Sequence, residues 1–397
     1  MRYQLNLLKL MLVLVLFNIG FALSWLFIGI YIFNLTSDLL LVTLFYSVSQ
    51  TAWILGSMFW GYIADVHLKR KTVLGITNIM FGMFIIAFVF SSNPLILLFF
   101  FALSYFFAGG RIPSVNAYIT VIEKSKGKAI SKVMSAGSLG WFFGSLLSGF
   151  IFENLEPTIL YLFSSLLVTT AGVIAFTLYE SEKSSSKSNK SQLAVYLELL
   201  KNHIILVVCL IGLMMMISAY LVFSIFPVYV VNGLGGDPMT YAFASSIATI
   251  TGAFVALALG HLSEKKRFGR FGAILFTITG YLIVFYLIST KDLFMALVAW
   301  ALPIYPGIFI GSAALISDYT DENIRSRGMA LFDSFQNFGI MVGYTLSTLV
   351  VFMFNIEDVL VAMSLFVKIS MFIASVVLVL SFLVYYVLLK KKKYRTL

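Results

Sequence analysis

The sequence predicts an all-α integral membrane protein of twelve transmembrane helices, arranged as two pseudo-symmetric six-helix bundles. Of its 397 residues, 60% are hydrophobic and only 11% are charged, whereas a soluble domain carries roughly 25% charged residues. The chain contains twelve apolar runs near or above the roughly 20 residues that span a bilayer. Its two halves also share short sequence features at a near-constant offset. Lipid is therefore the expected solvent for much of the surface.

The predicted spans are separated by turn-forming segments such as 34–38, 91–94 and 233–238. Several runs exceed 20 residues, which is consistent with tilted helices. The twelve spans are 7–33, 40–66, 72–91, 94–121, 129–153, 157–179, 203–232, 239–262, 270–289, 292–318, 327–353 and 359–389.

The basic residues are confined to alternate loops. The net charge of +10 could suggest nucleic-acid binding, but 24 of the 27 Lys and Arg residues lie in the loops on one side of the predicted membrane and at the two ends of the chain. The loops on the other side hold Lys291 and mostly acidic residues. The positive-inside rule therefore places both termini in the cytoplasm. Because the basic residues are explained as orientation signals, nucleic acid is not an expected partner.

One long polar segment, 180–202, is rich in Ser and Lys and is predicted to be a flexible cytoplasmic linker. It separates a bundle at 1–179 from a second bundle at 203–397, which ends in a short basic tail. Short features recur between the halves: Gly61 and Asp65 are followed 199 residues later by Gly260 and Glu264. A duplicated six-helix unit is typical of secondary transporters.

The segment GYIADVHLKRK at 61–71 resembles the signature loop between helices 2 and 3 of the major facilitator superfamily. Val66 and Leu68 depart from that pattern. The residues that match are Gly61, Asp65, Lys69, Arg70 and Lys71, and those of the second copy are Gly260, Glu264, Lys265 and Arg270. Glu123, at the end of the fourth span, recurs as Glu322 at the same offset.

These motif residues predict a gate between the two halves. A carboxylate at the membrane edge can contact a helix N-terminus or a basic side chain, and breaking that contact would let one half move. The glycines would permit close helix contact. The alternative is that the charges serve only to orient the helices.

The resemblance implies secondary active transport by alternating access around a central site, coupled to an ion, with a proton as the first expectation. No GxxxxGK[ST] loop is present, so direct use of ATP is not expected. In the fifth span, Gly140, Gly144 and Gly149 are similar to the glycine-rich signature of the drug–proton antiporters, although Ser145 replaces its proline. The same glycines would equally serve helix packing.

Three charged residues lie inside predicted spans. Arg111 is twelve residues from Glu123, hence about 18 Å from the cytoplasmic end of its helix, and is a substrate-binding candidate together with Asn116. Its alternative role is an internal contact that holds helices together. Asp333 is a coupling candidate or a gate residue. Lys368 can extend toward the outer surface, and the resemblance implies that its helix is peripheral.

Aromatic and amide side chains in the spans are further candidates for the cavity lining, although packing accounts for many aromatic residues in such a chain. These candidates are Trp25, Tyr220, Trp300, Gln336 and Asn337, with Trp141 and Tyr305 as weaker ones.

Three functions remain open at this point. The first is export of drugs or amphiphiles, the second is transport of an organic anion or another metabolite through Arg111, and the third is a non-transporting membrane sensor or intramembrane enzyme. The last is disfavoured because a single Cys and three scattered His residues give neither metal-ligand spacing nor a catalytic cluster. The expected partners are a small molecule, a coupling ion and the bilayer of the cell membrane. No cofactor is expected, and the chain is expected to act as a monomer.

Overall fold

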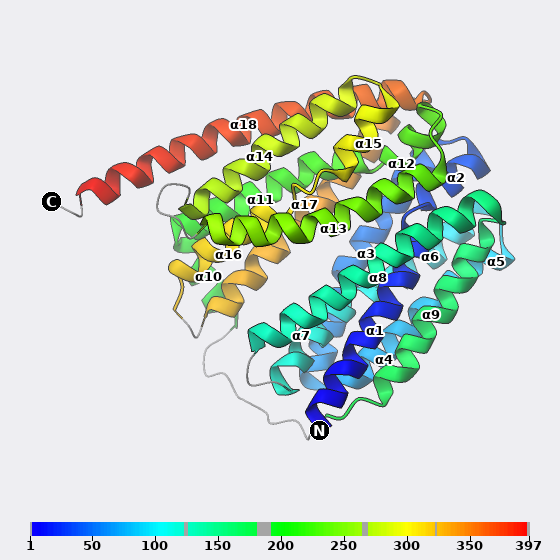
Figure 1. Ribbon diagram of the computed structural model, residues 1–397, viewed down its shortest axis with the longest axis horizontal. Helices are drawn as coiled ribbons and strands as arrows, with labels where there is room; N and C mark the ends of the chain where they lie inside the picture. Colours follow the sequence, from blue (N-terminus) through cyan, green and yellow to red (C-terminus); the bar gives the residue numbers. More distant parts are fainter. Residues whose placement is uncertain (1, 123–125, 181–191, 264–268, 322–323, 395–397) are drawn as a thin grey trace. The chain divides into compact units, whose positions relative to one another are not determined.

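The computed structural model describes residues 2–122, 126–180, 192–263, 269–321 and 324–394, and every regular element in these ranges is a helix (Figure 1). Twelve helical segments of the described chain are long and apolar enough to cross a membrane. They run from Gln4–Thr36 to Val359–Tyr386, and their ends lie within about five residues of the predicted ones. The all-α membrane class is therefore confirmed.

Several spans consist of two or three helical pieces because the backbone breaks locally, for example at Gly109 and Gly110 and at 302–305. The first six spans are formed by α1 (Arg2–Trp25) with α2 (Ile28–Thr36), α3 (Leu39–Val66), α4 (Arg70–Ile85) with α5 (Ala87–Phe90), α6 (Pro94–Ala108) with α7 (Arg111–Ile122), α8 (Lys126–Asn154) and α9 (Thr158–Phe176). The other six are formed by α11 (His203–Phe223) with α12 (Phe226–Val228) and the π-helix η1 (Tyr229–Gly233), α13 (Pro238–Ser263), α14 (Gly269–Ser289), α15 (Leu293–Ala301) with α16 (Pro306–Asp318), α17 (Arg325–Phe354) and α18 (Val359–Tyr394).

Short polar side chains start several of these helices. Asp38 accepts a hydrogen bond from the backbone N–H of Leu40 at 2.7 Å, and Asn93 accepts one from Leu95 at 3.0 Å. Both residues are N-caps, which satisfy backbone donors that have no partner inside the helix. The turn-forming segments of the sequence therefore act as helix starts.

The described part of the segment 180–202 is mostly helical. Gln192–Lys201 forms helix α10, in which Val195 and Leu199 are buried. Glu180, at the start of the segment, is also buried. The Ser- and Lys-rich stretch 181–191 lies outside the described residues. The apolar positions of α10 explain this helix, because burial of one face outweighs a polar average composition.

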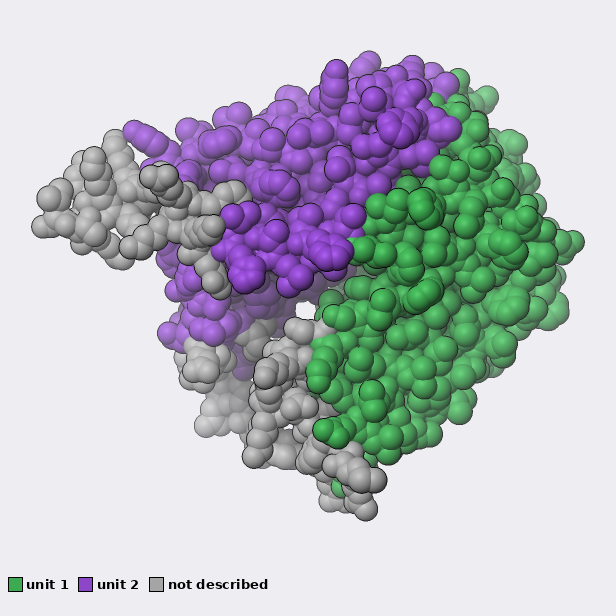
Figure 2. All heavy atoms as spheres, in the orientation of Figure 1, with its two compact units in different colours: residues 1–185, 224–250, 351–359 green, residues 186–223, 251–350, 360–397 purple. Residues whose placement is uncertain are grey.

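The chain divides into two compact units, green and purple in Figure 2. Unit 1 comprises residues 1–185, 224–250 and 351–359, and unit 2 comprises 186–223, 251–350 and 360–397.

Residues 224–250 belong to unit 1 because they pack on its first helices. The Asn232 side chain donates a hydrogen bond to Asn34 at 2.8 Å, and the backbone N–H of Met239 donates one to Glu153 at 3.1 Å. These contacts join the π-helix η1 to α2 and the start of α13 to the end of α8.

Glycines of α8 allow two close helix contacts in unit 1. A Cβ at Gly140 would lie 2.5 Å from the backbone oxygen of Val15, and one at Gly144 would lie 2.8 Å from Ala22 Cβ. A Cβ at Gly149 would likewise clash with the side chain of Ala242 in α13. Only the absence of a side chain permits such approaches, so these three glycines of α8 have a packing role here.

Candidate functional site

Arg111 starts α7 in the interior of unit 1, where its guanidinium carbon lies 4.3 Å from the centre of the Phe17 ring of α1. A cation over an aromatic face is attracted by the ring quadrupole. No hydrogen bond or ion pair joins the Arg111 side chain to any other described residue, and its Nε atom is buried. The residue as a whole is only half-buried. Because no acidic side chain of the described chain pairs with it, the guanidinium can still bind an anion.

The rings around Phe17 form one continuous aromatic cluster in unit 1. Phe17 stacks on Phe21 with ring centres 5.6 Å apart, and Phe21 stacks in turn on Trp25 at 6.4 Å. Trp53 and Trp141 lie 5.9 and 6.1 Å from Phe21. Two predicted lining residues, Trp25 and Trp141, thus belong to the same aromatic cluster as Phe17, the ring on which Arg111 stacks.

Several rings of this cluster, Phe17 and Tyr105 among them, were not among the sequence candidates. Phe17, fully buried, is the platform for Arg111, and Tyr105 of α6 lies 5.5 Å from Phe21 and 5.7 Å from Trp25 between ring centres. The Tyr105 hydroxyl is buried and has no hydrogen-bond partner among the described residues. Asn116, in contrast, has an exposed side chain further along α7.

The candidates of the second half lie in unit 2. Trp300 and Tyr220 both contact Phe223, with ring centres 5.1 and 5.7 Å away. On α17, the Asn337 side chain donates a hydrogen bond to the backbone oxygen of Asp333 at 2.9 Å. Asp333, also on α17, and Lys368, on α18, are both exposed.

Gln336 is the buried member of this set. It is 2% exposed, and neither of its amide atoms has a partner in the described part of the chain. A Cβ at Gly212 of α11 would lie 3.4 Å from its Cγ. Gln336 therefore points toward α11, away from the exposed side of α17 that carries Asp333.

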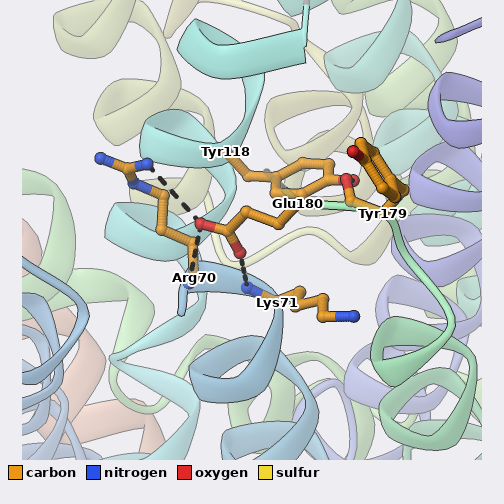
Figure 3. Close-up of polar contacts among 5 residues, drawn as sticks. All are labelled: Arg70, Lys71, Tyr118, Tyr179 and Glu180. Carbon is orange, nitrogen blue, oxygen red and sulfur yellow. Dashed lines mark hydrogen bonds and ion pairs between the residues drawn. The ribbon is translucent and has the colours of Figure 1, made fainter. Parts of the chain in front are cut away.

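The motif loop of the first half is organised by Glu180, which the sequence analysis did not select (Figure 3). Its carboxylate accepts hydrogen bonds from the backbone N–H groups of Arg70, at 3.2 Å, and Lys71, at 3.0 Å, and lies 3.6 Å from the Arg70 guanidinium. The Glu180 side chain is 2% exposed. A carboxylate thus does contact a helix N-terminus here, as the motif analysis expected of a motif residue, but it comes from Glu180, outside the motif.

The residues next to Glu180 are held in the same way. Tyr118 donates its hydroxyl to the backbone oxygen of Tyr179 at 2.7 Å, and the Tyr179 N–H donates to the Asn6 side chain at 3.2 Å. The Lys71 ammonium donates to the Phe176 backbone oxygen at 3.2 Å. Helices α1, α4 and α7 therefore all fix the end of α9.

Asp65, Lys69 and Gly61 show less contact than the motif suggests. The side chains of Asp65 and Lys69 are exposed, and neither has a hydrogen bond or ion pair to another described residue. A Cβ at Gly61 would be 3.7 Å from Pro113, an ordinary contact, and one at Gly260 would have nothing within 4 Å. The expected close helix contact at these two glycines is absent among the described residues.

The second copy of the motif is described only in part, because Glu264 and Lys265 lie outside the described residues, as does Glu123. Arg270 forms an ion pair with Asp318 and donates a hydrogen bond to the Ala314 backbone oxygen at 3.0 Å. In both halves, an arginine of the motif is therefore paired with an acid beyond the motif. No group of His, Cys, Asp and Glu in the described chain could hold a metal ion.

Known proteins resemble this chain in sequence and in fold. It is 25% identical over 312 residues to the proton-coupled antiporter flippase LtaA of Staphylococcus haemolyticus, and the match covers 75% of this chain and 74% of that protein. A crystal structure of the nucleoside transporter NupG matches with a TM-score of 0.73 and 18% identity, over 95% of this chain and 99% of that one.

A bacterial homologue of the human lysosomal transporter Spinster, inward-facing and unoccupied, matches with a TM-score of 0.75 and 15% identity, over 96% and 95% of the two chains. The family model of the Major Facilitator Superfamily matches residues 10–310. Since that match covers most of the chain, and the fold agrees with it, this multi-pass membrane protein belongs to the Major Facilitator Superfamily of transporters and is not an enzyme.

Proposed function

We propose that this protein is a proton-coupled secondary transporter of an anionic amphiphile, and that Arg111 binds the anionic head group. The observation that carries the proposal is the position of the Arg111 guanidinium, stacked on Phe17 without an acidic partner among the described residues. An arginine inside a membrane span is costly unless it is solvated or paired. A phosphate, sulfate or carboxylate would supply two acceptors for its planar fork.

The aromatic cluster supports an amphiphile rather than a small hydrophilic anion. Rings of Phe21, Trp25 and Trp141 continue from Phe17 along α1 and α8. Such rings offer a large apolar surface to a chain or ring attached to the head group. The relative that is a proton-coupled antiporter flippase also favours an amphiphilic substrate and a proton as the coupling ion.

Asp333 is the proposed site of proton coupling. It is an acidic residue within the span Arg327–Phe354, and its side chain is exposed, as is that of the next residue, Ser334. An accessible carboxylate inside a span can take up and release a proton, which is the role of acidic residues in many pumps and transporters. The alternative, a gating contact with a basic loop, would leave transport sensitive to charge but not to a pH gradient.

The remaining elements of the proposal concern architecture. We infer that residues 1–179 and 203–397 are the two repeated bundles, that both termini and the segment 180–202 face the cytoplasm, and that one copy of the chain is the transporting unit. The arrangement of Lys and Arg in alternate loops supports the orientation. Alternating access between the two repeats is the mechanism expected of this family.

The test is transport of a fluorescent alkyl phosphate into proteoliposomes under an imposed pH gradient. We expect the wild-type protein to accumulate it only when the gradient is present, Asp333→Asn to lose the gradient dependence, and Arg111→Ala to lose uptake. A matched alkyl ammonium should not be transported. Equal uptake of both compounds, independent of Arg111, would instead favour an exporter of amphiphiles that does not recognise charge.

A further inference from the structure

Asn78, on α4, is a buried amide without a partner. It is 0% exposed, and both its side-chain nitrogen and its side-chain oxygen are buried without a hydrogen bond to any described residue. The great majority of buried polar atoms in folded proteins are hydrogen-bonded. Two unsatisfied atoms on one buried side chain are therefore an unusual feature that calls for a ligand or a functional reason.

Asn78 shares a helix face with Phe81, a ring of the aromatic cluster on which Arg111 stacks. It precedes Phe81 by three residues on α4, so the two side chains share one face of that helix. The Phe81 ring centre is 5.8 Å from that of Phe17 and 6.4 Å from that of Tyr105. Arg111 stacks on Phe17, so the unsatisfied atoms of Arg111 and Tyr105 belong to one set of rings, and Asn78 lies one helical turn from Phe81 of that set.

These groups differ in what they can offer a ligand. The guanidinium only donates hydrogen bonds, whereas an amide offers two donors and an acceptor, and a phenol can do both. A bare anion would satisfy Arg111 but would leave the Asn78 oxygen without a donor. A head group that carries hydroxyls next to its anionic group would satisfy both residues.

We propose that Asn78 is a specificity-determining residue of this site, and that the substrate is an amphiphile whose anionic head group also carries hydroxyl groups. This proposal rests on the proposed function, because it assigns the anion to Arg111. Asn78 is fully buried, whereas Arg111 is half-buried. Because Asn78 is 0% exposed, surrounding side chains must move for a head group to reach its amide.

The test uses two matched ligands, dodecyl phosphoglycerol and dodecyl methyl phosphate, which share the chain and the single negative charge but differ in the glycerol hydroxyls. Affinity is measured on the full-length purified protein in the same detergent. We expect the wild type to prefer the glycerol ester about tenfold, the effect of one satisfied hydrogen bond to a buried group. Asn78→Leu should bind both ligands equally, at the wild-type affinity for the methyl ester.

Stability distinguishes a binding residue from a structural one. Leu has nearly the shape of Asn, and replacing an unpartnered buried amide by an apolar group is neutral or stabilising. Asn78→Leu should therefore melt at or above the wild-type temperature. The matched control is Asn6→Leu, since Asn6 is also buried but accepts a hydrogen bond from Tyr179. It should melt lower and keep the ligand preference.

The outcomes separate this proposal from the previous one. If neither ligand binds, or if both bind independently of Arg111, the proposed function fails. If both bind through Arg111 with equal affinity to the wild type, only the role of Asn78 is overturned. It is equally overturned if Asn78→Leu fails to fold or keeps the preference. Asn78→Ser, which retains one hydroxyl, should show an intermediate preference.

Discussion

Glu180 and Arg70 are joined by two contacts: the Glu180 carboxylate accepts the Arg70 backbone N–H at 3.2 Å and lies 3.6 Å from the Arg70 guanidinium. They are 110 residues apart in the chain, at the end of one helix and the start of another. The carboxylate also accepts the N–H of Lys71, so it satisfies two free donors of the α4 N-terminus. A residue outside the motif, Glu180, thus holds the end of the signature loop in place.

Loss of this carboxylate should destabilise the protein. Glu180→Ala leaves two backbone donors and the Arg70 side chain without their acceptor in a buried place, so we expect a loss of about 1–3 kcal/mol. Thermal unfolding in detergent measures it. Glu357→Ala, at an exposed position, is the control and should change stability by less than about 0.5 kcal/mol. Equal melting temperatures for the two variants would show that the Glu180 contacts are not formed in solution.

Asp65 is expected to matter for transport rather than for stability. Its side chain is exposed and makes no hydrogen bond or ion pair with another described residue. A gate residue needs its partner only in another state of the transport cycle. We expect Asp65→Asn to lower the transport rate at least tenfold with an unchanged melting temperature.

The control for Asp65 is the same substitution at the other end of α3. Asp38 is the N-cap there, and Asn is an equally good cap, so Asp38→Asn should change neither property. Normal transport by Asp65→Asn would mean that the motif serves only to orient the helices in the membrane.

Two glycines of matched local structure should respond oppositely to alanine. At Gly144 the added methyl would clash with α1, at 2.8 Å from Ala22 Cβ and from the Ile19 oxygen, and we expect a loss of about 1–3 kcal/mol. At Gly260 the added methyl would have no described atom within 4 Å, so alanine should raise helix stability by up to about 1 kcal/mol. Melting temperatures of both variants test this. Destabilisation at Gly260 would reveal a close contact that the described residues do not contain.

The orientation is testable with single cysteines in a Cys209→Ala background, which removes a buried native thiol. Lys201 and Glu156 are exposed positions on opposite sides of the predicted topology. A membrane-impermeant maleimide applied to intact cells should label Glu156→Cys but not Lys201→Cys, and permeabilised cells should show both. Labelling of Lys201→Cys from outside would reverse the assignment of the termini.

Much of the fold was predictable because hydropathy and loop charge are local properties. The apolar run 40–66 and the helix Leu39–Val66 differ by one residue, since lipid imposes both its length and its composition. Helix α10 was missed because the Ser- and Lys-rich composition of 180–202 predicted a flexible linker. Burial of Val195 and Leu199 stabilises the helix, and composition does not report burial.

The candidate site was less predictable. Arg111 was identifiable because a charge inside a span is rare and costly. Its platform, Phe17, is one of 39 phenylalanines, and only the tertiary structure distinguishes it from the others. Glu180 and Asn78 were missed for a related reason: a helix cap formed across 110 residues and an unsatisfied amide both depend on burial, which sequence pattern does not report for single polar residues.

The central claim is that Arg111 binds an anionic head group, and its most direct measurement is the affinity of dodecyl phosphate for wild-type, Arg111→Lys and Arg111→Ala proteins, with the melting temperature of each. Lysine keeps the charge but lacks the planar fork, so we expect intermediate affinity for Arg111→Lys. Arg111→Ala should fold with a melting temperature near that of the wild type and bind at least a hundredfold more weakly. If Arg111→Ala instead binds dodecyl phosphate normally and melts well below the wild type, Arg111 is a structural residue and the claim is wrong.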